Sequence, residues 1–190
     1  PRRRELLTNA NYQFHVRSLE VSENIDVNLN PRENASQIAT AKATACLHHY
    51  KELNSPGFLI LAADTIVVLG DQILGKPRDP TQAVEFLHRL SGKTHSVITG
   101  FCLIEGGATK IWRGFDETLV SFRKLSDHEI TAYAQSGEPM DKAGAYAIQG
   151  GAAKFVSSYT GSWSNVVGLP LEKLETVLRE NGWTVRRRAP

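Results

Sequence analysis

Asp64 interrupts a long apolar stretch, and this position makes it the residue that most suggests a chemical role. Residues 58–63 precede the Asp64-Thr65 pair, and the apolar residues 66–69 follow it. Burying an ionised carboxylate is costly unless it is paired with a cation, bound to a metal or placed at an open strand end. An aspartate that merely caps a strand is the alternative, but the apolar run continues beyond it. Asp64 is therefore a candidate for catalysis.

Basic residues at three places could hold phosphate groups. Arg2 and Arg3 belong to an arginine triplet at a predicted helix start, where guanidinium groups and backbone N–H donors suit phosphate oxygens. Lys76 lies in a Gly-Lys-Pro sequence and Lys142 in Asp-Lys-Ala-Gly, and a lysine is a point charge that suits phosphates. Neither belongs to a Walker loop, because the upstream glycine and the following Ser or Thr are absent. Taken alone, each also fits a solvated surface.

Two glycine-bearing stretches could approach a ligand. Residues 144–151 allow close backbone approach without the dinucleotide-binding spacing, and Gln149 within them could pair with the edge of a base. Residues 161–170 fit either a ligand loop or a helix start, and we favour a helix start with packing. A metal site at Cys46, His48 and His49 is disfavoured, because adjacent histidines point to different faces of a helix.

Helix and strand signals alternate along the chain, which favours an α/β architecture. Capping residues, prolines and apolar spacing predict five helices, over residues 3–7, 31–53, 80–90, 126–135 and 170–181. Apolar patterns predict four strands, over residues 14–19, 58–69, 96–104 and 111–122. Gly70-Asp71 is typical of a tight turn that returns through Ile73 and Leu74.

Composition excludes some classes of protein. The 190 residues are 41% hydrophobic and 22% charged with a net charge of +2, which is typical of a globular domain. No apolar run approaches the ~20 residues of a membrane-spanning helix. The two cysteines do not form a disulfide framework, which fits a reducing, cytoplasmic location. The basic residues form no long stripe and no nucleic-acid recognition motif, so we expect no nucleic-acid partner.

In their order and spacing, these segments resemble the Maf family of nucleotide pyrophosphatases across essentially the whole chain. The matching sequences are PRRRELL (1–7), IATAKA (38–43), AADTIVV (62–68), GKP (75–77), SGKTHSVITG (91–100), SGEPMDKAGAYAIQG (136–150) and GSWSNVVGLPL (161–171). The resemblance implies one Maf-like domain over residues 1–190. Its fold would be the elongated, mixed-sheet, inosine-triphosphatase-like fold with a central cleft between two lobes, often as a homodimer. The family's first strand would precede Pro1.

The resemblance also implies roles for individual residues. Asp64 corresponds to the proton acceptor of the family, and the residues that correspond to its phosphate-binding and other polar cleft residues are Arg2, Arg3, Glu23, Lys42, Lys76 and Lys142. Thr65 and Gln149 correspond to base-selective contacts. Ser22-Glu23 stands where the family has an acidic pair, which leaves Glu23 as the expected ligand of a divalent cation, Mg²⁺ or Mn²⁺.

The expected reaction is hydrolysis of dTTP and UTP, or of modified pyrimidine nucleotides, to the monophosphate and pyrophosphate. Arg2, the Asp64-Thr65 pair and Gln149 match the branch of the family that acts on pyrimidine nucleotides. One alternative is a pyrophosphatase for methylated GTP or purine triphosphates. A second, from another functional class, is a nucleic-acid-binding regulator of septum formation.

Overall fold

The computed structural model describes residues 1–107 and 110–187, and it has a mixed α/β fold. The chain divides into two compact units. Unit 1 comprises residues 1–64, 99–116 and 168–190, and unit 2 comprises residues 65–98 and 117–167. Three long strands contribute residues to both units: β1 (Leu59–Leu69), β3 (Thr94–Glu105) and β4 (Ile111–Phe122).

These strands belong to a five-stranded sheet in the order β2-β1-β3-β4-β5. The short strand β2 (Gln72–Leu74) pairs antiparallel with β1 and β5 (Val156–Thr160) pairs antiparallel with β4. The predicted turn between β1 and β2 is confirmed, and Gly70 adopts a φ of +60° there, a conformation that glycine tolerates best. Strand β5 was not predicted, because most of its residues are exposed and its sequence carries no apolar alternation.

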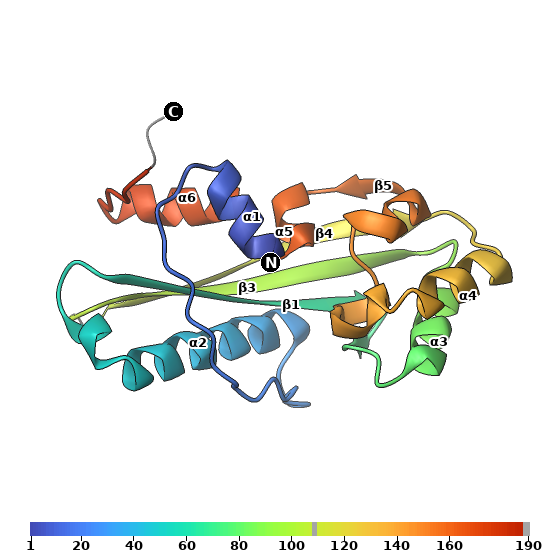
Figure 1. The fold of residues 1–190 in the computed structure, drawn as a ribbon, viewed down its shortest axis with the longest axis horizontal. Helices are drawn as coiled ribbons and strands as arrows, with labels where there is room; N and C mark the ends of the chain where they lie inside the picture. Colours follow the sequence, from blue (N-terminus) through green and yellow to red (C-terminus); the bar gives the residue numbers. More distant parts are fainter. Residues whose placement is uncertain (108–109, 188–190) are drawn as a thin grey trace. The chain divides into compact units, whose positions relative to one another are not determined.

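Unit 1 has helices on both sides of its strand segments. Figure 1 shows α2 (Pro31–His49) on one side and α1 (Arg2–Asn9) with α6 (Leu171–Glu180) on the other. Asn30 and Glu33 form a capping box at the start of α2, which fixes where the helix begins. A core of small and apolar side chains fills the space between α2 and the strands: Ala39, Ala43, Ile60, Cys102 and Ile104.

Helix α2 approaches β3 very closely. A Cβ atom at Gly100 of β3 would lie 2.3 Å from the backbone carbonyl carbon of Ala35, so only glycine fits at this contact. Ala35, Ala39 and Ala43 are fully buried, which allows the helix and strand backbones to come together. The alanine-rich face of α2 thus fixes how far from the strands its polar side chains lie.

Unit 2 contains the remaining helices. Helices α3 (Pro80–Leu90) and α4 (Asp127–Gln135) pack against each other, and both begin where the sequence predicts. The Ser126 and Glu129 side chains form the predicted capping box at the start of α4. The short helix α5 (Trp163–Val167) and three 3₁₀ segments, η2 (Glu138–Asp141), η3 (Ala143–Ala145) and η4 (Gly150–Phe155), complete the unit. Residues 164–170 are buried, in line with the packing role expected for that stretch.

Two predictions about local structure were wrong. Residues 14–19 form no strand, since they pair with no neighbour and Val16 is half exposed. An isolated bridge between Tyr12 and Arg187 is the nearest pairing. The predicted helix over residues 31–53 ends as an α-helix at His49 and continues after Tyr50 as a 3₁₀ turn, η1 (Lys51–Asn54). Apolar spacing alone does not distinguish these two helix types.

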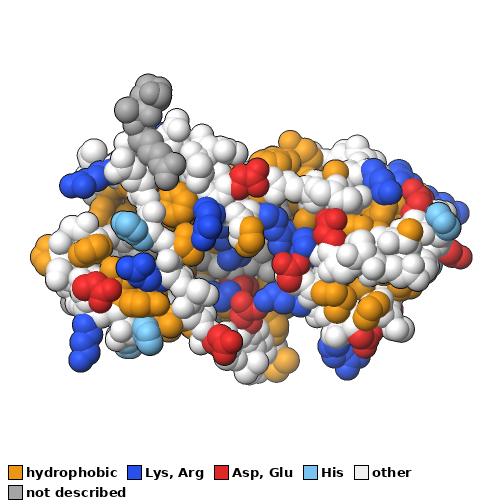
Figure 2. All heavy atoms as spheres, in the orientation of Figure 1, with side chains coloured by type: hydrophobic (Ala, Val, Ile, Leu, Met, Phe, Trp, Pro, Cys, Tyr) orange, Lys and Arg blue, Asp and Glu red, His pale blue; other side chains and the backbone are white. Residues whose placement is uncertain are grey.

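Charged side chains of both signs are interspersed over the face shown in Figure 2. That distribution agrees with the small net charge of +2. Within residues 1–107 and 110–187, no helix combines the length and the apolar character that crossing a membrane would need.

Candidate active site

An ammonium group shared by two carboxylates is the central feature of unit 1. Lys42 Nζ donates to Glu23 Oε1 at 2.5 Å and to Asp64 Oδ1 at 2.7 Å. The Asp64 side chain is 9% exposed, that of Lys42 21% and that of Glu23 37%. The cost of burying Asp64 is therefore offset by a cation at hydrogen-bonding distance. Lys42 is thus the cationic partner that a carboxylate within an apolar strand requires.

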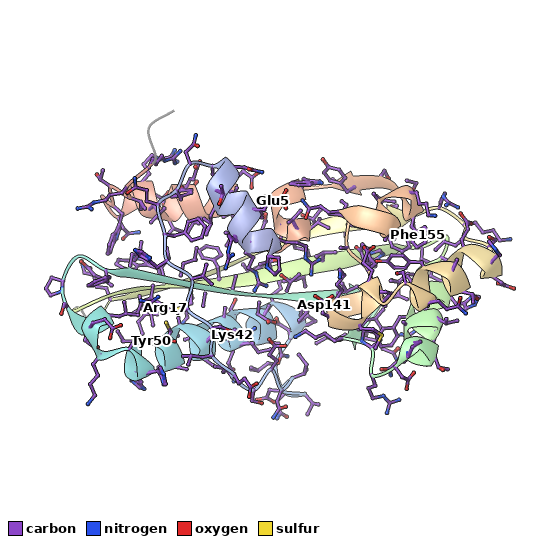
Figure 3. All side chains as sticks on the ribbon, viewed as in Figure 1. Glu5, Arg17, Lys42, Tyr50, Asp141 and Phe155 are labelled. Atoms are coloured by element: carbon purple, nitrogen blue, oxygen red, sulfur yellow. The ribbon has the colours of Figure 1, made fainter. Side chains whose placement is uncertain are left out.

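Three different elements supply this cluster. Lys42 lies in the middle of α2, Asp64 on β1, and Glu23 in the irregular segment that leads into α2. Figure 3 labels Lys42 on α2. The closely packed alanines of α2 leave a lysine on the same helix within reach of the strand.

Asn34 fixes the irregular segment that carries Glu23. Its buried amide donates to the carbonyl groups of Asp26 at 2.9 Å and Leu29 at 3.1 Å, and its Oδ1 accepts from Asp26 N at 2.8 Å. Sequence analysis missed this residue. A polar residue one turn into a helix, next to the buried Ala35, was the available signal.

The predicted arginines lie within the electrostatic field of this cluster. Arg3 Nε donates to the Gly168 carbonyl at 2.7 Å. Burial lowers the pKa of Arg3, the negative charges of Asp64 and Glu23 raise it, and the positive charge of Arg2 lowers it. All five predicted site residues of unit 1 therefore interact in one region: Arg2, Arg3, Glu23, Lys42 and Asp64.

The other four predicted residues belong to unit 2. Thr65 is half-buried on β1, and Lys76 is exposed just after β2. Gly144 N donates to the Gly75 carbonyl at 3.0 Å, which joins the segment of Lys142 to the segment of Lys76. Gln149 is half-buried directly before η4. That these four residues serve the same substrate as the five of unit 1 stays a prediction.

Lys142 has protein partners for its charge. Its ammonium donates to Asp141 Oδ1 at 2.6 Å and to the Glu138 carbonyl. Figure 3 labels Asp141, whose side chain is largely exposed. Glu138, which the sequence analysis did not single out, also accepts from Gly151 N at 3.2 Å and from the Tyr133 hydroxyl at 3.0 Å. The Glu138 carboxylate thereby joins α4 to the last residue of the glycine-rich stretch.

The residues of unit 1 fit a divalent cation in part. No group of three or more His, Cys, Asp and Glu side chains suited to a metal occurs within residues 1–107 and 110–187. Two carboxylates, those of Glu23 and Asp64, nevertheless converge on one positive charge. Mg²⁺ and Mn²⁺ suit such a place, because they take few carboxylates and complete their shell with water and substrate phosphates.

Comparison with known proteins identifies the family. A sequence model of the Maf-like proteins matches residues 1–181. The chain belongs to the Maf-like family. Its curated relatives include proteins named dTTP/UTP pyrophosphatase from Bdellovibrio bacteriovorus and from Alkaliphilus oremlandii. The former is 43% identical over 94% of this chain and 93% of the relative, and the latter is 45% identical over 95% and 92%.

A third relative of the same name comes from Neisseria meningitidis and is 40% identical over 96% of this chain and 91% of its own length. The match to the Maf-like family spans the cluster of unit 1 and the glycine-rich stretch of unit 2. The resemblance drawn from the ordered motifs is confirmed, and so is the mixed α/β fold class, while the cleft between two lobes stays a prediction.

Proposed function

We propose that this Maf-like protein hydrolyses dTTP and UTP to the nucleoside monophosphate and pyrophosphate. The observation that carries the proposal is the pairing of the buried Asp64 carboxylate with the Lys42 ammonium at 2.7 Å. It places a carboxylate that could accept a proton beside cationic side chains in the same unit. The names of three relatives at 40–45% identity, matched over more than nine tenths of both chains, support the same reaction.

In the proposed reaction, a water molecule attacks the α-phosphorus and the bond between that phosphorus and the α,β-bridging oxygen breaks. The electron pair of this bond leaves with pyrophosphate, and the proton of the water passes to Asp64. Because Asp64 Oδ1 accepts from Lys42, the second carboxylate oxygen is the one that would take the proton. Arg2 and Arg3 would offset negative charge on the triphosphate, together with Lys76 from unit 2.

Glu23 is the residue that would hold a divalent cation. Bound there, Mg²⁺ or Mn²⁺ would supply positive charge to the triphosphate oxygens. Lys42 pairs with both carboxylates through one ammonium group. A cation held by Glu23 would therefore compete with this ammonium for the carboxylate oxygens.

Thr65 and Gln149 are the residues proposed to select the base. A site that hydrogen-bonds the edge of one base rejects another strongly, since its polar groups are then left unpaired. Both residues are half-buried, so they remain partly accessible to a ligand.

The proposal extends to where and in what form the protein acts. Both cysteines, Cys46 and Cys102, are free thiols, which suits the reducing cytoplasm. A homodimer is part of the proposal, and light scattering on the purified chain measures it.

A panel of nucleoside triphosphates tests the function. With Mg²⁺ or Mn²⁺, we expect pyrophosphate release from dTTP and UTP to exceed release from dGTP, GTP, methylated GTP and ITP. In ¹⁸O-labelled water, the label should enter the monophosphate, because attack occurs at the α-phosphorus. Label in pyrophosphate, or a preference for a purine triphosphate, would contradict the proposal. Salt-sensitive DNA binding without any hydrolysis would favour the regulatory alternative.

A further inference from the structure

A buried histidine–tyrosine pair in unit 2 has no place in the proposed chemistry. His95 lies on β3 and is 2% exposed, and its Nε2 is 2.7 Å from the hydroxyl oxygen of Tyr146, which is 5% exposed. Their rings meet edge to face, with centroids 5.3 Å apart. The Phe122 ring packs edge-on against both, at 5.1 Å from His95 and 4.7 Å from Tyr146. The two polar groups are therefore enclosed by an aromatic cluster, where few orientations are available to them.

Both members of the pair are neutral in this environment. Burial lowers the pKa of His95 to about 4, so the imidazole is uncharged at neutral pH. Burial raises the pKa of Tyr146, so its phenol keeps its proton. Whichever tautomer His95 adopts, one hydrogen bond joins the two side chains.

The second ring nitrogen of His95 makes this pair an unusual core feature. Nδ1 is buried and has no hydrogen-bond partner within the described residues. A buried polar atom without a partner destabilises a fold, and an apolar side chain of similar size would avoid that cost. The pair is therefore poorly explained by stability alone, which points to a requirement for the bond that it makes to Tyr146.

Tyr146 lies in the segment that joins Lys142 to Gln149. Gly144 and Ala145 have φ values of +66° and +62°, two consecutive left-handed residues that turn the chain sharply. A Cβ atom at Gly144 would lie 2.9 Å from the Val67 side chain on β1, so this turn packs directly on the strand. A left-handed alanine persists only where its surroundings hold it.

Three hydrogen bonds hold this segment along its length. Near its start Gly144 N donates to the Gly75 carbonyl, and just beyond its end Gly151 N donates to Glu138 Oε2. Between them, the bond between His95 and Tyr146 fixes the segment to β3, three residues before Gln149. The position of the Gln149 side chain thus depends on where the Tyr146 hydroxyl is held.

We propose that His95 and Tyr146 are positioning residues that set the base selectivity of the enzyme by fixing the segment that carries Gln149. The inference rests on the proposed function, in which Gln149 contacts the base. Neither residue needs to touch the nucleotide. Their hydrogen bond holds Gln149 where its amide can pair with a pyrimidine edge, and its loss lets the segment shift without removing any substrate contact.

The test compares dTTP with dGTP, which share the sugar and the triphosphate and differ in the base. In Tyr146→Phe, which removes only the hydroxyl, the ratio of kcat/KM for dTTP to that for dGTP should fall roughly tenfold, since small displacements of a contact group have effects up to ~100-fold. The kcat for dTTP should change much less. His95→Leu should have the same effect, and the double variant should be no worse than either single one, because all three remove the same bond.

Phe155→Leu is the matched control. Phe155 is the last residue of η4 and is fully buried in the same unit, where it packs against Phe122 and Tyr133. Figure 3 labels it. This variant loosens the aromatic core but keeps the hydroxyl and the imidazole. We expect it to lower stability and to leave the dTTP to dGTP ratio at the wild-type value. Hydrogen exchange should be faster over residues 145–149 in Tyr146→Phe than in the control.

Wild-type selectivity in Tyr146→Phe and His95→Leu, measured where both are folded, would overturn the inference and leave the proposed function standing. An equal loss of selectivity in Phe155→Leu would also overturn it, because general loosening of the core would then explain the effect. If the wild-type protein releases no pyrophosphate from either nucleotide, the proposed function fails first and the inference fails with it.

Discussion

Replacing Lys42 by methionine removes the ammonium that Asp64 and Glu23 share, while keeping the length of the side chain and the helix propensity of α2. Removing one partner of a fully buried ion pair costs about 3–5 kcal/mol. Lys42 is one fifth exposed and Glu23 more than a third, so solvent screens part of this effect. We expect Lys42→Met to lower the free energy of unfolding by about 2 kcal/mol, which corresponds to roughly 4–8 °C in Tm for a chain of this size.

A double-mutant cycle shows whether the loss comes from the pair. Asp64→Asn removes the buried charge, so the double variant should recover about 1–2 kcal/mol relative to the sum of the single variants. Lys173→Met is the matched control, because Lys173 Nζ is 3.0 Å from Asp116 in the same unit but half exposed. It should lose less than about 1 kcal/mol. Urea unfolding at pH 7 measures all four variants.

The structural reasoning would be refuted by single effects that add within about 0.5 kcal/mol. It would also fail if the control lost as much stability as Lys42→Met. Either result would mean that the contacts between Lys42 and the two carboxylates contribute little, despite their short distances.

Three other predictions concern the metal, the core and the base. In the absence of nucleotide, Glu23→Gln should weaken Mn²⁺ binding and Lys42→Met should tighten it. Affinities equal to that of the wild type, measured by electron paramagnetic resonance, would count against a metal site at Glu23. Between pH 6.5 and about 4, His95 takes up a proton in the unfolded chain but stays neutral in the folded protein, because burial lowers its pKa. Wild-type stability should therefore fall as the pH drops through this window by up to about 3 kcal/mol. In His95→Leu, the part of this pH-dependent loss that comes from His95 should be absent when stability is measured by urea unfolding at each pH. Parallel curves of stability against pH for the two proteins would contradict the prediction. Gln149→Ala should erode the preference for dTTP and UTP over purine triphosphates, and an unaltered preference in the substrate panel would exclude the base contact.

Signals between neighbouring residues predicted much of the fold. The helix start at Pro31, the capping box at Ser126 and the turn at Gly70 depend on contacts within a few residues, and all three occur where the sequence indicates. The strand expected over residues 14–19 failed because a strand needs a partner, which its own sequence does not specify.

The candidate site was predictable only in part, for a related reason. A charge inside an apolar run drew attention to Asp64, and the order of the motifs indicated Lys42 and Glu23. The bonds that join them span 22 and 19 residues along the chain and exist only after α2 packs on the strands. Asn34 bonds to backbone groups of Asp26 and Leu29, and those partners cannot be read from its place in the helix. The buried bond of Tyr146 likewise depends on a histidine 51 residues away.

The most direct test of the central claim is turnover of dTTP by Asp64→Asn, with nucleotide binding measured on the same sample. If Asp64 accepts the proton of the attacking water, pyrophosphate release should fall by roughly 10²–10⁴-fold, while the Kd for dTTP with Mg²⁺ changes by only a few fold. Turnover near the wild-type rate would contradict the account. So would a loss of binding as large as the loss of turnover, because Asp64 would then hold the nucleotide instead of activating water.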